Sequence, residues 1–246
     1  MAKSLVTNLR HEIKLLIPYA DYIALSRRLS VILEKDKFTK ENGDYFIRSL
    51  YLDDIYNSSY VEKIAGTDNR CKYRIRIYNC SDDVIKLEKK EKFGARIKKT
   101  SCSITREMYD ELMAGNPAPL LETGEPLAKE VYTMVRARKL APSVIVDYDR
   151  EAYVHPLSNT RLTFDKSLHS GVSGFDIFDK DAVTLPIFPN GSVIFEVKYD
   201  TYLPAHLAAI ISSARGLKLS LSKFCMCREK LADVNATSLQ TLLHTR

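Results

Sequence analysis

The stretch RCKYRIRIYN, residues 70–79, decides the fold. From residue 72 to 78 its side chains alternate between two chemical kinds. One parity holds Tyr73, Ile75 and Ile77, and the other holds Lys72, Arg74, Arg76 and Tyr78. Strict alternation predicts a half-buried strand whose neighbouring side chains point to opposite faces. One face of this strand is therefore apolar. The other is cationic, and its charges repel each other, so it needs an explanation.

Basic residues are concentrated around this stretch. Residues 68–100 hold eleven cationic side chains and five anionic ones, an excess of six that equals the net charge of +6 of the whole chain. The remainder of the chain is therefore neutral overall. Such a concentration of positive charge indicates an anionic partner, whether nucleic acid, phosphate or an acidic surface.

Length and composition are those of a soluble globular protein. The chain has 246 residues, 45% of them hydrophobic and 28% charged, and can bury a core without disulfide staples. Five cysteines, an odd number, favour a reducing cytoplasmic setting. The first residues have no apolar core of signal-peptide length, and no segment approaches the ~20 apolar residues that a membrane helix needs.

Strand patterning recurs along the chain and alternates with a few helical patterns. We expect strands at 9–17, 44–53, 70–79, 84–91, 95–103, 141–155, 160–168 and 191–200. We expect helices at 18–33, 55–66, 105–115, 126–139, 204–215 and 220–233, followed by a frayed polar tail from about residue 235. Asp82 and Asp83 are expected to form the turn after the third strand, and Gly94 the next turn.

Charged pairs lie on one face of several of these strands. The pairs are Glu12 and Lys14, Glu88 and Lys90, and Glu196 and Lys198. For any one strand a solvated face is the better interpretation. It fits residues 193–197 poorly, because apolar side chains occupy both parities there. A closed barrel explains both observations, with apolar side chains under outer helices and a polar interior. We therefore expect one α+β domain over residues 1–246, built on an eight-stranded antiparallel closed barrel.

Cations inside a barrel require a compensating anion. Buried charges without partners cost several kcal/mol each. A tri- or polyphosphate chain is long, narrow and highly charged, and both arginine and lysine match its phosphoryl oxygens. Interior glutamates in such a tunnel fit ligands of a divalent cation.

Eight segments, in order along the chain, resemble one known family. They are RHEIK (10–14), RSLYLD (48–53), KYRIRIY (72–78), LEKK (87–90) with Lys98 beyond it, YDREAY (148–153), RLTFD (161–165), FEVKYD (195–200) and LSKFC (221–225). Together they resemble the VTC domain, the polyphosphate polymerase domain of the vacuolar transporter chaperone complex, within the triphosphate tunnel metalloenzyme superfamily. The resemblance runs from about residue 10 to 230.

The resemblance implies an activity and a set of site residues. It implies transfer of the terminal phosphoryl group of ATP to a growing inorganic polyphosphate chain, with a divalent metal, Mn²⁺ or Mg²⁺. Arg74, Arg76, Lys90, Lys98, Arg161 and Lys198 are the expected catalytic residues. Lys14, Arg48, Lys72, Arg150 and Lys223 are expected to bind substrate, and Glu196, Glu12 and Glu88 to bind the metal. Eukaryotic members of the family work inside a membrane assembly, so a membrane-protein partner is compatible with this chain.

Three other functions compete with polymerase activity. A tripolyphosphatase or nucleoside triphosphatase would use the same tunnel and metal with water as the acceptor. A non-catalytic domain that binds polyphosphate or inositol pyrophosphate would gain little from interior carboxylates. An RNA-binding sheet would need exposed aromatic side chains on the basic face, where Tyr78 alone stands in this stretch, so we expect no nucleic-acid partner.

Overall fold

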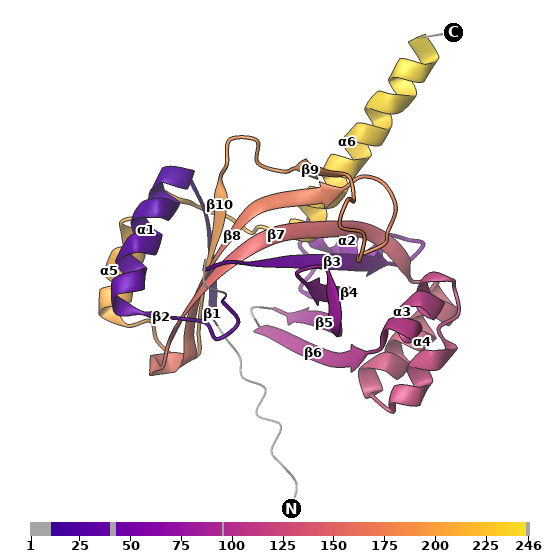
Figure 1. The fold of residues 1–246 in the computed structure, drawn as a ribbon, viewed down its shortest axis with the longest axis horizontal. Helices are drawn as coiled ribbons and strands as arrows, with labels where there is room; N and C mark the ends of the chain where they lie inside the picture. The colour runs from indigo at the N-terminus through magenta and orange to yellow at the C-terminus, as the bar shows by residue number, and fades with distance from the viewer. Residues whose placement is uncertain (1–10, 40–42, 95, 245–246) are drawn as a thin grey trace, which may run out of the picture.

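The computed structural model describes residues 11–39, 43–94 and 96–244. Eight long strands lie where the alternation predicts them (Figure 1). They are β1 (His11–Ile17), β3 (Tyr45–Asp53), β4 (Asn69–Tyr78), β5 (Ser81–Phe93), β6 (Arg96–Ile104), β7 (Ala141–His155), β8 (Thr160–Gly171) and β10 (Val193–Tyr199). The short strands are β2 (Glu34–Lys35), β9 (Thr184–Pro186) and β11 (Leu217–Lys218). Residues 9 and 10 of the first predicted strand lie outside the described residues.

The helices also follow the predicted pattern. They are α1 (Tyr19–Ile32), α2 (Ser58–Ile64), α3 (Arg106–Met113), α4 (Pro126–Arg138), α5 (Ala205–Ser212) and α6 (Lys223–His244), with 3₁₀ turns η1 (Ala118–Thr123) and η2 (Leu157–Asn159). The frayed tail expected from about residue 235 is part of α6 as far as His244. None of the helices in the described part of the chain combines the length and apolarity required to cross a membrane.

The strands form one antiparallel sheet of eleven strands. Its order is β11-β1-β10-β8-β7-β3-β4-β5-β6, with β2 added on β7 and β9 on β8. The expected antiparallel pairing is confirmed, but the expected closed barrel of eight strands is not, because this hydrogen-bonded path ends at β11 and at β6. The sheet nevertheless curls on itself, since Glu12 of β1 lies 3.5 Å from Lys90 of β5. We call the inner side of the curled sheet the bore.

Two helical layers cover the outside of the sheet. Apolar residues of α1 and α5, such as Leu25, Leu29 and Leu207, pack on β8 and β10 through Phe164 and Phe195. On the other half, α3 and α4 cover β4, β5 and β6 around a second apolar cluster. Figure 1 shows these helix pairs at opposite sides of the molecule. This arrangement explains why apolar side chains appear on the outward parity of the strands.

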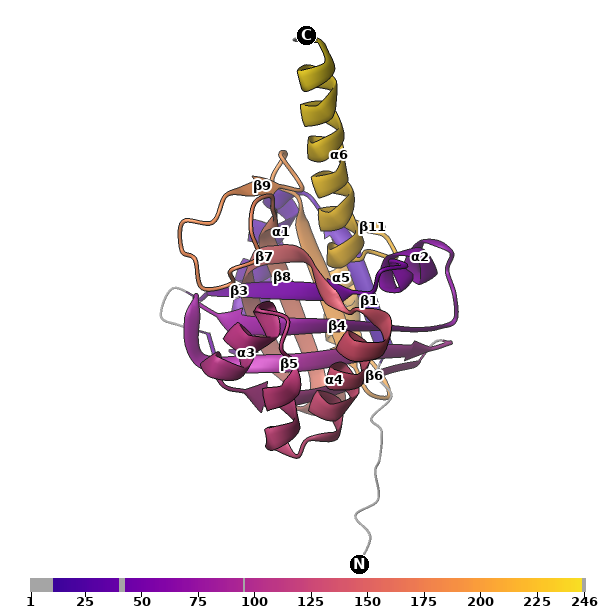
Figure 2. The same cartoon turned by 90° about the vertical axis from the view of Figure 1, so that its right-hand side faces the viewer.

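A third apolar cluster lies on the inner side. The first turns of α6 bring Phe224, Cys225 and Cys227 against inward-facing side chains that include Ile47 and Ile194. The rest of α6 projects away from the body (Figure 2). The sequence predicted a polar interior. The structure differs, because α6 fills part of the interior with apolar side chains.

One predicted turn lies elsewhere. Asp82 and Asp83 belong to β5, and the β4–β5 turn is formed by Asn79 and Cys80, whose φ angles are +53° and +52°. Two consecutive residues with positive φ fit the twist of a tight hairpin, and asparagine tolerates this conformation well. The turn therefore begins three residues earlier than the acidic pair suggested.

Candidate functional site

The register of the sheet identifies the side chains that share the inner face. Lys14 of β1 pairs with Glu196 of β10, and Glu196 pairs with Thr163 of β8. On the other half of the sheet, Arg74 of β4 pairs with Glu88 of β5. Cross-strand partners point to the same side of a sheet, so each such set shares one face. The Glu12–Lys90 contact across the interior shows that this common face is the bore.

The first group of charges joins β1 and β10. Lys198 lies 3.1 Å from Glu196 and 3.7 Å from Glu12. Lys14 lies 3.6 Å and 3.5 Å from the same two carboxylates. Lys90 approaches Glu12 from β5 at 3.5 Å. Three lysines thus share two glutamates, which leaves this group with a positive charge.

The second group surrounds Glu88, which is 2% exposed. Arg74 contacts this carboxylate at 2.7 Å, Arg76 at 3.8 Å, and Lys99 of β6 forms a third ion pair with it. Arg74 also donates a hydrogen bond to the Tyr51 hydroxyl at 2.8 Å. Three cations again meet one carboxylate.

The third group is centred on Asp165 of β8. Arg150 of β7 donates to both carboxylate oxygens at 2.6 and 2.8 Å, and Lys223 of α6 contacts one of them at 2.6 Å. Tyr148 links this group to the second one. Its hydroxyl accepts a hydrogen bond from Arg76 at 3.1 Å, and Lys223 Nζ lies 4.9 Å from the centre of its ring.

Two further cations stand at the margins of the bore. Arg161 of β8 pairs with Asp36 at 2.8 Å and donates to the Tyr45 hydroxyl at 3.1 Å. Lys72 of β4 contacts the Ser222 hydroxyl at 2.8 Å, just before α6 begins. Lys72 thus lies beside the helix that enters the interior.

Four lysines of the bore have lowered pKa values. Burial and the neighbouring charges of Lys14 and Lys198 lower the pKa of Lys90 to about 7, although Glu12 acts in the opposite direction. Burial is also the main reason that the pKa values of Lys14 and Lys198 fall to about 8. The pKa of Lys72 falls to about 8, again mainly through burial. These cations lack sufficient negative charge around them.

Three carboxylates of the bore, Glu12, Glu88 and Asp165, have lowered pKa values. Burial raises the pKa of Glu12, but Lys14, Lys90 and Lys198 outweigh it and lower the pKa to about 2. The same balance, with different cations, holds the pKa values of Glu88 and Asp165 well below their usual range. Cations outnumber the carboxylates. The bore cations are Lys14, Lys72, Arg74, Arg76, Lys90, Lys99, Arg150, Arg161, Lys198 and Lys223, and the carboxylates are Glu12, Glu88, Asp165 and Glu196, with Asp36 beside Arg161 at the margin.

The expectation that Arg48 lines the tunnel is wrong. Arg48 faces outward from β3, where its guanidinium forms a buried ion pair with Asp147 of β7 at 2.8 Å. It also donates to the backbone carbonyls of Ile177 and Asp179. The inward positions of this part of β3 are held by Ile47 and Ser49, whose neighbour on β4 is Arg76.

Lys98 is likewise not in the bore. It pairs in register with Glu91 on the outward side of the β5–β6 hairpin, 4.0 Å from its carboxylate. The inward position belongs to Lys99, which lies opposite Lys90. The hairpin turn contains Gly94 and places Phe93 opposite Arg96, so counting back from this turn would have identified Lys99.

The site predicted from the sequence also lacked Asp165 and Tyr148. Asp165 shares the strand parity of Arg161, which was a usable signal. Tyr148 precedes Arg150 by two residues and lies on the same face. By contrast, no local sequence pattern shows that Arg76 donates a hydrogen bond to the Tyr148 hydroxyl.

A comparison with protein families identifies the chain. The model of the VTC domain matches residues 9–232. The chain belongs to the VTC domain family. No curated protein matches it. The match covers all the site residues discussed above.

Solved structures show the fold of this VTC domain elsewhere. A Hippeastrum protein, a candidate adenylyl cyclase described as having a dominant triphosphatase activity, is 16% identical and superposes with a TM-score of 0.56. The match covers 90% of this chain and 96% of that one. A candidate adenylate cyclase from Bacillus halodurans is 12% identical, with a TM-score of 0.45 and coverage of 82% and 84%. The Hippeastrum structure therefore shares the overall fold of this VTC domain.

Two of the three glutamates expected to hold a metal fit that task. Glu12 and Glu196 share Lys14 and Lys198 as neighbours, and the buried Oε1 of Glu12 has no hydrogen-bond partner in the described part of the chain. Among the described residues, no cluster of three or more His, Cys, Asp or Glu is arranged to hold an ion. One or two carboxylates completed by substrate phosphates is, however, a usual arrangement for Mg²⁺. Glu88 fits less well, because Arg74 contacts it directly at 2.7 Å and Lys99 also pairs closely with it, whereas the three lysines around Glu12 stay 3.5 Å or more away.

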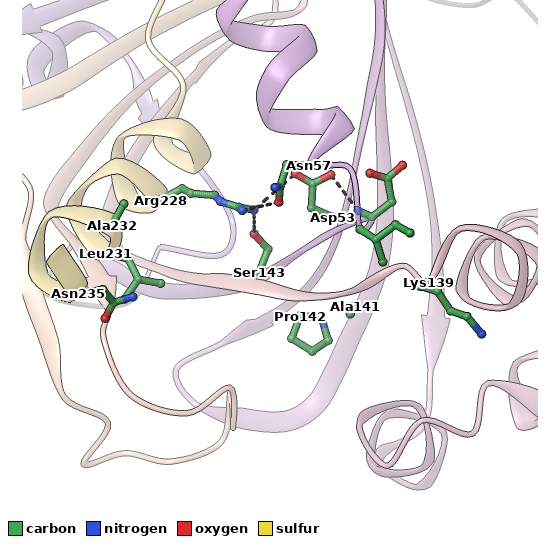
Figure 3. A pocket seen from close by; sticks show the side chains of 12 residues that line it. Asp53, Asn57, Lys139, Ala141, Pro142, Ser143, Arg228, Leu231, Ala232 and Asn235 are labelled. Carbon is green, nitrogen blue, oxygen red and sulfur yellow. Dashed lines mark hydrogen bonds and ion pairs between the residues drawn. The ribbon is translucent and has the colours of Figure 1, made fainter. Parts of the chain in front are cut away.

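A cavity of about 330 Å³ lies outside the bore, between α6, the start of β7 and the turn before α2 (Figure 3). Arg228 of α6 crosses it, donating to the Ser143 hydroxyl at 2.5 Å and to the Asn57 side chain. Asp53 accepts backbone N–H groups from Ser59 and Tyr60. The Arg228–Ser143 contact ties α6 to β7, and the Asp53 contacts tie α2 to β3.

Proposed function

We propose that this VTC domain is a polyphosphate polymerase, which transfers the terminal phosphoryl group of ATP to a growing inorganic polyphosphate chain. The observation that carries the proposal is the excess of cations over carboxylates in the bore, together with the lowered lysine pKa values. A linear phosphate chain supplies negative charge along the whole length of such a site. Arginine forks and lysine ammonium groups both match phosphoryl oxygens.

The reaction asks the protein for alignment and charge stabilisation. The bond between the γ-phosphorus and its bridging oxygen breaks, a terminal oxygen of the acceptor phosphate bonds to that phosphorus, and ADP leaves. Arg74 and Arg76 would stabilise the charge on the transferred group, and Lys14, Lys198 and Arg150 would align the donor and the acceptor. No nucleophilic side chain is required.

A divalent cation, Mn²⁺ or Mg²⁺, completes the proposal. It would neutralise phosphoryl oxygens when bound, with Glu12 and Glu196 holding it. The partners would be ATP and inorganic polyphosphate, with no nucleic acid. A cytoplasmic location is supported by the five cysteines, all of which are free thiols. A membrane-protein partner that receives the product belongs to the same proposal.

A triphosphatase is the second candidate function. It would use the same bore with water as the acceptor, and the described activity of the Hippeastrum neighbour favours it. The test is incubation of the purified protein with ATP and Mn²⁺, followed by gel analysis of polyphosphate and assay of orthophosphate. Long chains with stoichiometric ADP are expected. Orthophosphate alone would show a hydrolase, and binding without turnover would show a non-catalytic domain.

A further inference from the structure

Three buried polar atoms on the bore face have no hydrogen-bond partner in the part of the chain that the structure describes. They are Glu12 Oε1, Arg161 Nε and Thr163 Oγ1. Glu12 Oε1 nevertheless has the ammonium groups of Lys14 and Lys198 at 3.5 and 3.7 Å. Buried polar atoms are nearly always hydrogen-bonded in native proteins, so an exception requires an explanation. A phosphate chain in the bore would account for the two donors, Arg161 Nε and Thr163 Oγ1, whereas Glu12 Oε1 already faces two lysines.

Thr163 is the member of this set to which no role has been given. It lies on β8 between Arg161 and Asp165, which share its face, and its neighbours in register are Glu196 on β10 and Ala152 on β7. Its exposed fraction is 3%. The hydroxyl is therefore surrounded by site residues but bonded to none of them.

The chemistry of the neighbours defines the missing partner. Arg161 uses its Nη2 on Asp36 and Tyr45, which leaves the N–H of its Nε available to an acceptor. The hydroxyl of Thr163, two residues along the same face, is likewise free to donate. Two unused donors on one strand fit a ligand that presents several acceptor oxygens, as a phosphate chain does.

We infer that Thr163 is a substrate-binding residue whose hydroxyl donates a hydrogen bond to a phosphoryl oxygen of the chain held beside Arg161 Nε. The inference rests on the proposed function as far as turnover is concerned, but the binding of a phosphate chain tests it independently. A short neutral donor adds little charge to the bore. Thr163 therefore fixes the position of the chain, while the surrounding cations attract it.

The test compares two buried threonines on opposite faces of β8. Thr163→Val removes an unpartnered hydroxyl, so we expect an unchanged or higher melting temperature, a roughly tenfold to hundredfold fall in kcat/KM, mainly through KM, and recovery in Thr163→Ser. Thr160→Val is the control. The Thr160 hydroxyl donates to the Leu157 carbonyl at 2.9 Å on the outward side, so this variant should melt earlier but keep the kcat/KM of the wild type.

Calorimetric binding of tripolyphosphate, with and without Mn²⁺, separates the two hypotheses. A tenfold or larger rise in Kd for Thr163→Val, absent in Thr163→Ser, supports the inference even if the wild-type protein turns over no substrate, in which case the proposed function alone fails. Equal Kd values for wild type and Thr163→Val overturn the inference and leave the proposed function standing. A melting temperature that falls as much in Thr163→Val as in Thr160→Val overturns it too, because the hydroxyl then has a structural partner.

Discussion

Two arginines in neighbouring strands of the same sheet show how differently a buried charge can be treated. Arg48 faces outward, where Asp147 and two backbone carbonyls occupy its guanidinium. Arg76 faces the bore, where it reaches Glu88 at 3.8 Å and shares that carboxylate with Arg74 and Lys99. The first charge is balanced within the protein and the second is not. An unbalanced buried charge indicates a ligand, whereas a balanced one braces the fold.

The largest effect should come from the bore. Replacing Arg76 with Ala should lower the turnover of ATP by about 10³-fold, because an arginine that stabilises a transferred phosphoryl group contributes on that scale. The melting temperature should change little. Steady-state assays and thermal unfolding check this, with Arg76→Lys as the conservative variant. Near-normal activity of Arg76→Ala would show that Arg76, like Arg48, has no part in turnover.

The opposite behaviour is expected of the outward arginine. Arg48→Ala strands Asp147 without its partner, and breaking a buried ion pair in this way costs about 3–5 kcal/mol of stability. Activity per folded molecule should stay close to that of the wild type. Chemical denaturation measures the first quantity, and assays on folded protein measure the second. The double variant Arg48→Met/Asp147→Leu should recover most of the stability, since it leaves no unpaired charge behind.

Lys98 and Lys99 of β6 allow the same comparison between an outward and an inward cation whose side chains are equally exposed. The side chains of Lys98 and Lys99 are 51% and 50% exposed, so exposure does not distinguish them. Lys99→Ala should reduce kcat/KM about tenfold, as expected for loss of one charge-assisted contact. Lys98→Ala should leave it within about twofold. Equal kinetics for the two variants would contradict the assigned register of the β5–β6 hairpin.

The smallest effect is a dependence of stability on pH. Burial lowers the pKa of Lys72 in the folded protein to about 8, below that of the unfolded chain. Between pH 8 and 9 the unfolded state therefore binds more protons at this position, and Lys72 should contribute about 1 kcal/mol to an increase in the stability of the ligand-free protein. Lys14 and Lys198, whose pKa values are also lowered to about 8, should contribute in the same direction. In urea unfolding series, Lys72→Met should reduce this increase by about 1 kcal/mol and leave the part that comes from Lys14 and Lys198. A wild-type profile that falls over this range would refute the assignment.

Strand parity was sufficient to find most of the bore. Arg74 and Arg76 stand in a strand whose other parity is apolar, so their side followed from alternation alone. Parity failed for Arg48, because every residue from Ile47 to Asp53 is buried and the two faces of β3 look alike in sequence. Its partner Asp147 is 99 residues away. A carboxylate at that distance cannot be assigned to it from local pattern.

Long-range arrangement explains the other differences. The last helix was predicted from its spacing, but its insertion beside Lys72 and Asp165 depends on tertiary contacts that no local pattern contains. The short strands β2, β9 and β11 contain two or three residues each, too few for alternation to be visible. They extend the sheet beyond the eight strands that alternation reveals.

The interruption of the ladder between β6 and β11 has a mechanical consequence. In a closed barrel, backbone hydrogen bonds around the whole circumference fix its diameter. In this open sheet, a side-chain ion pair between Glu12 and Lys90 spans the interior between the two halves instead. Side chains can lengthen or exchange such a contact without breaking backbone pairing. A small change in the width of the bore at this point would therefore break no backbone hydrogen bond between β1 and β5.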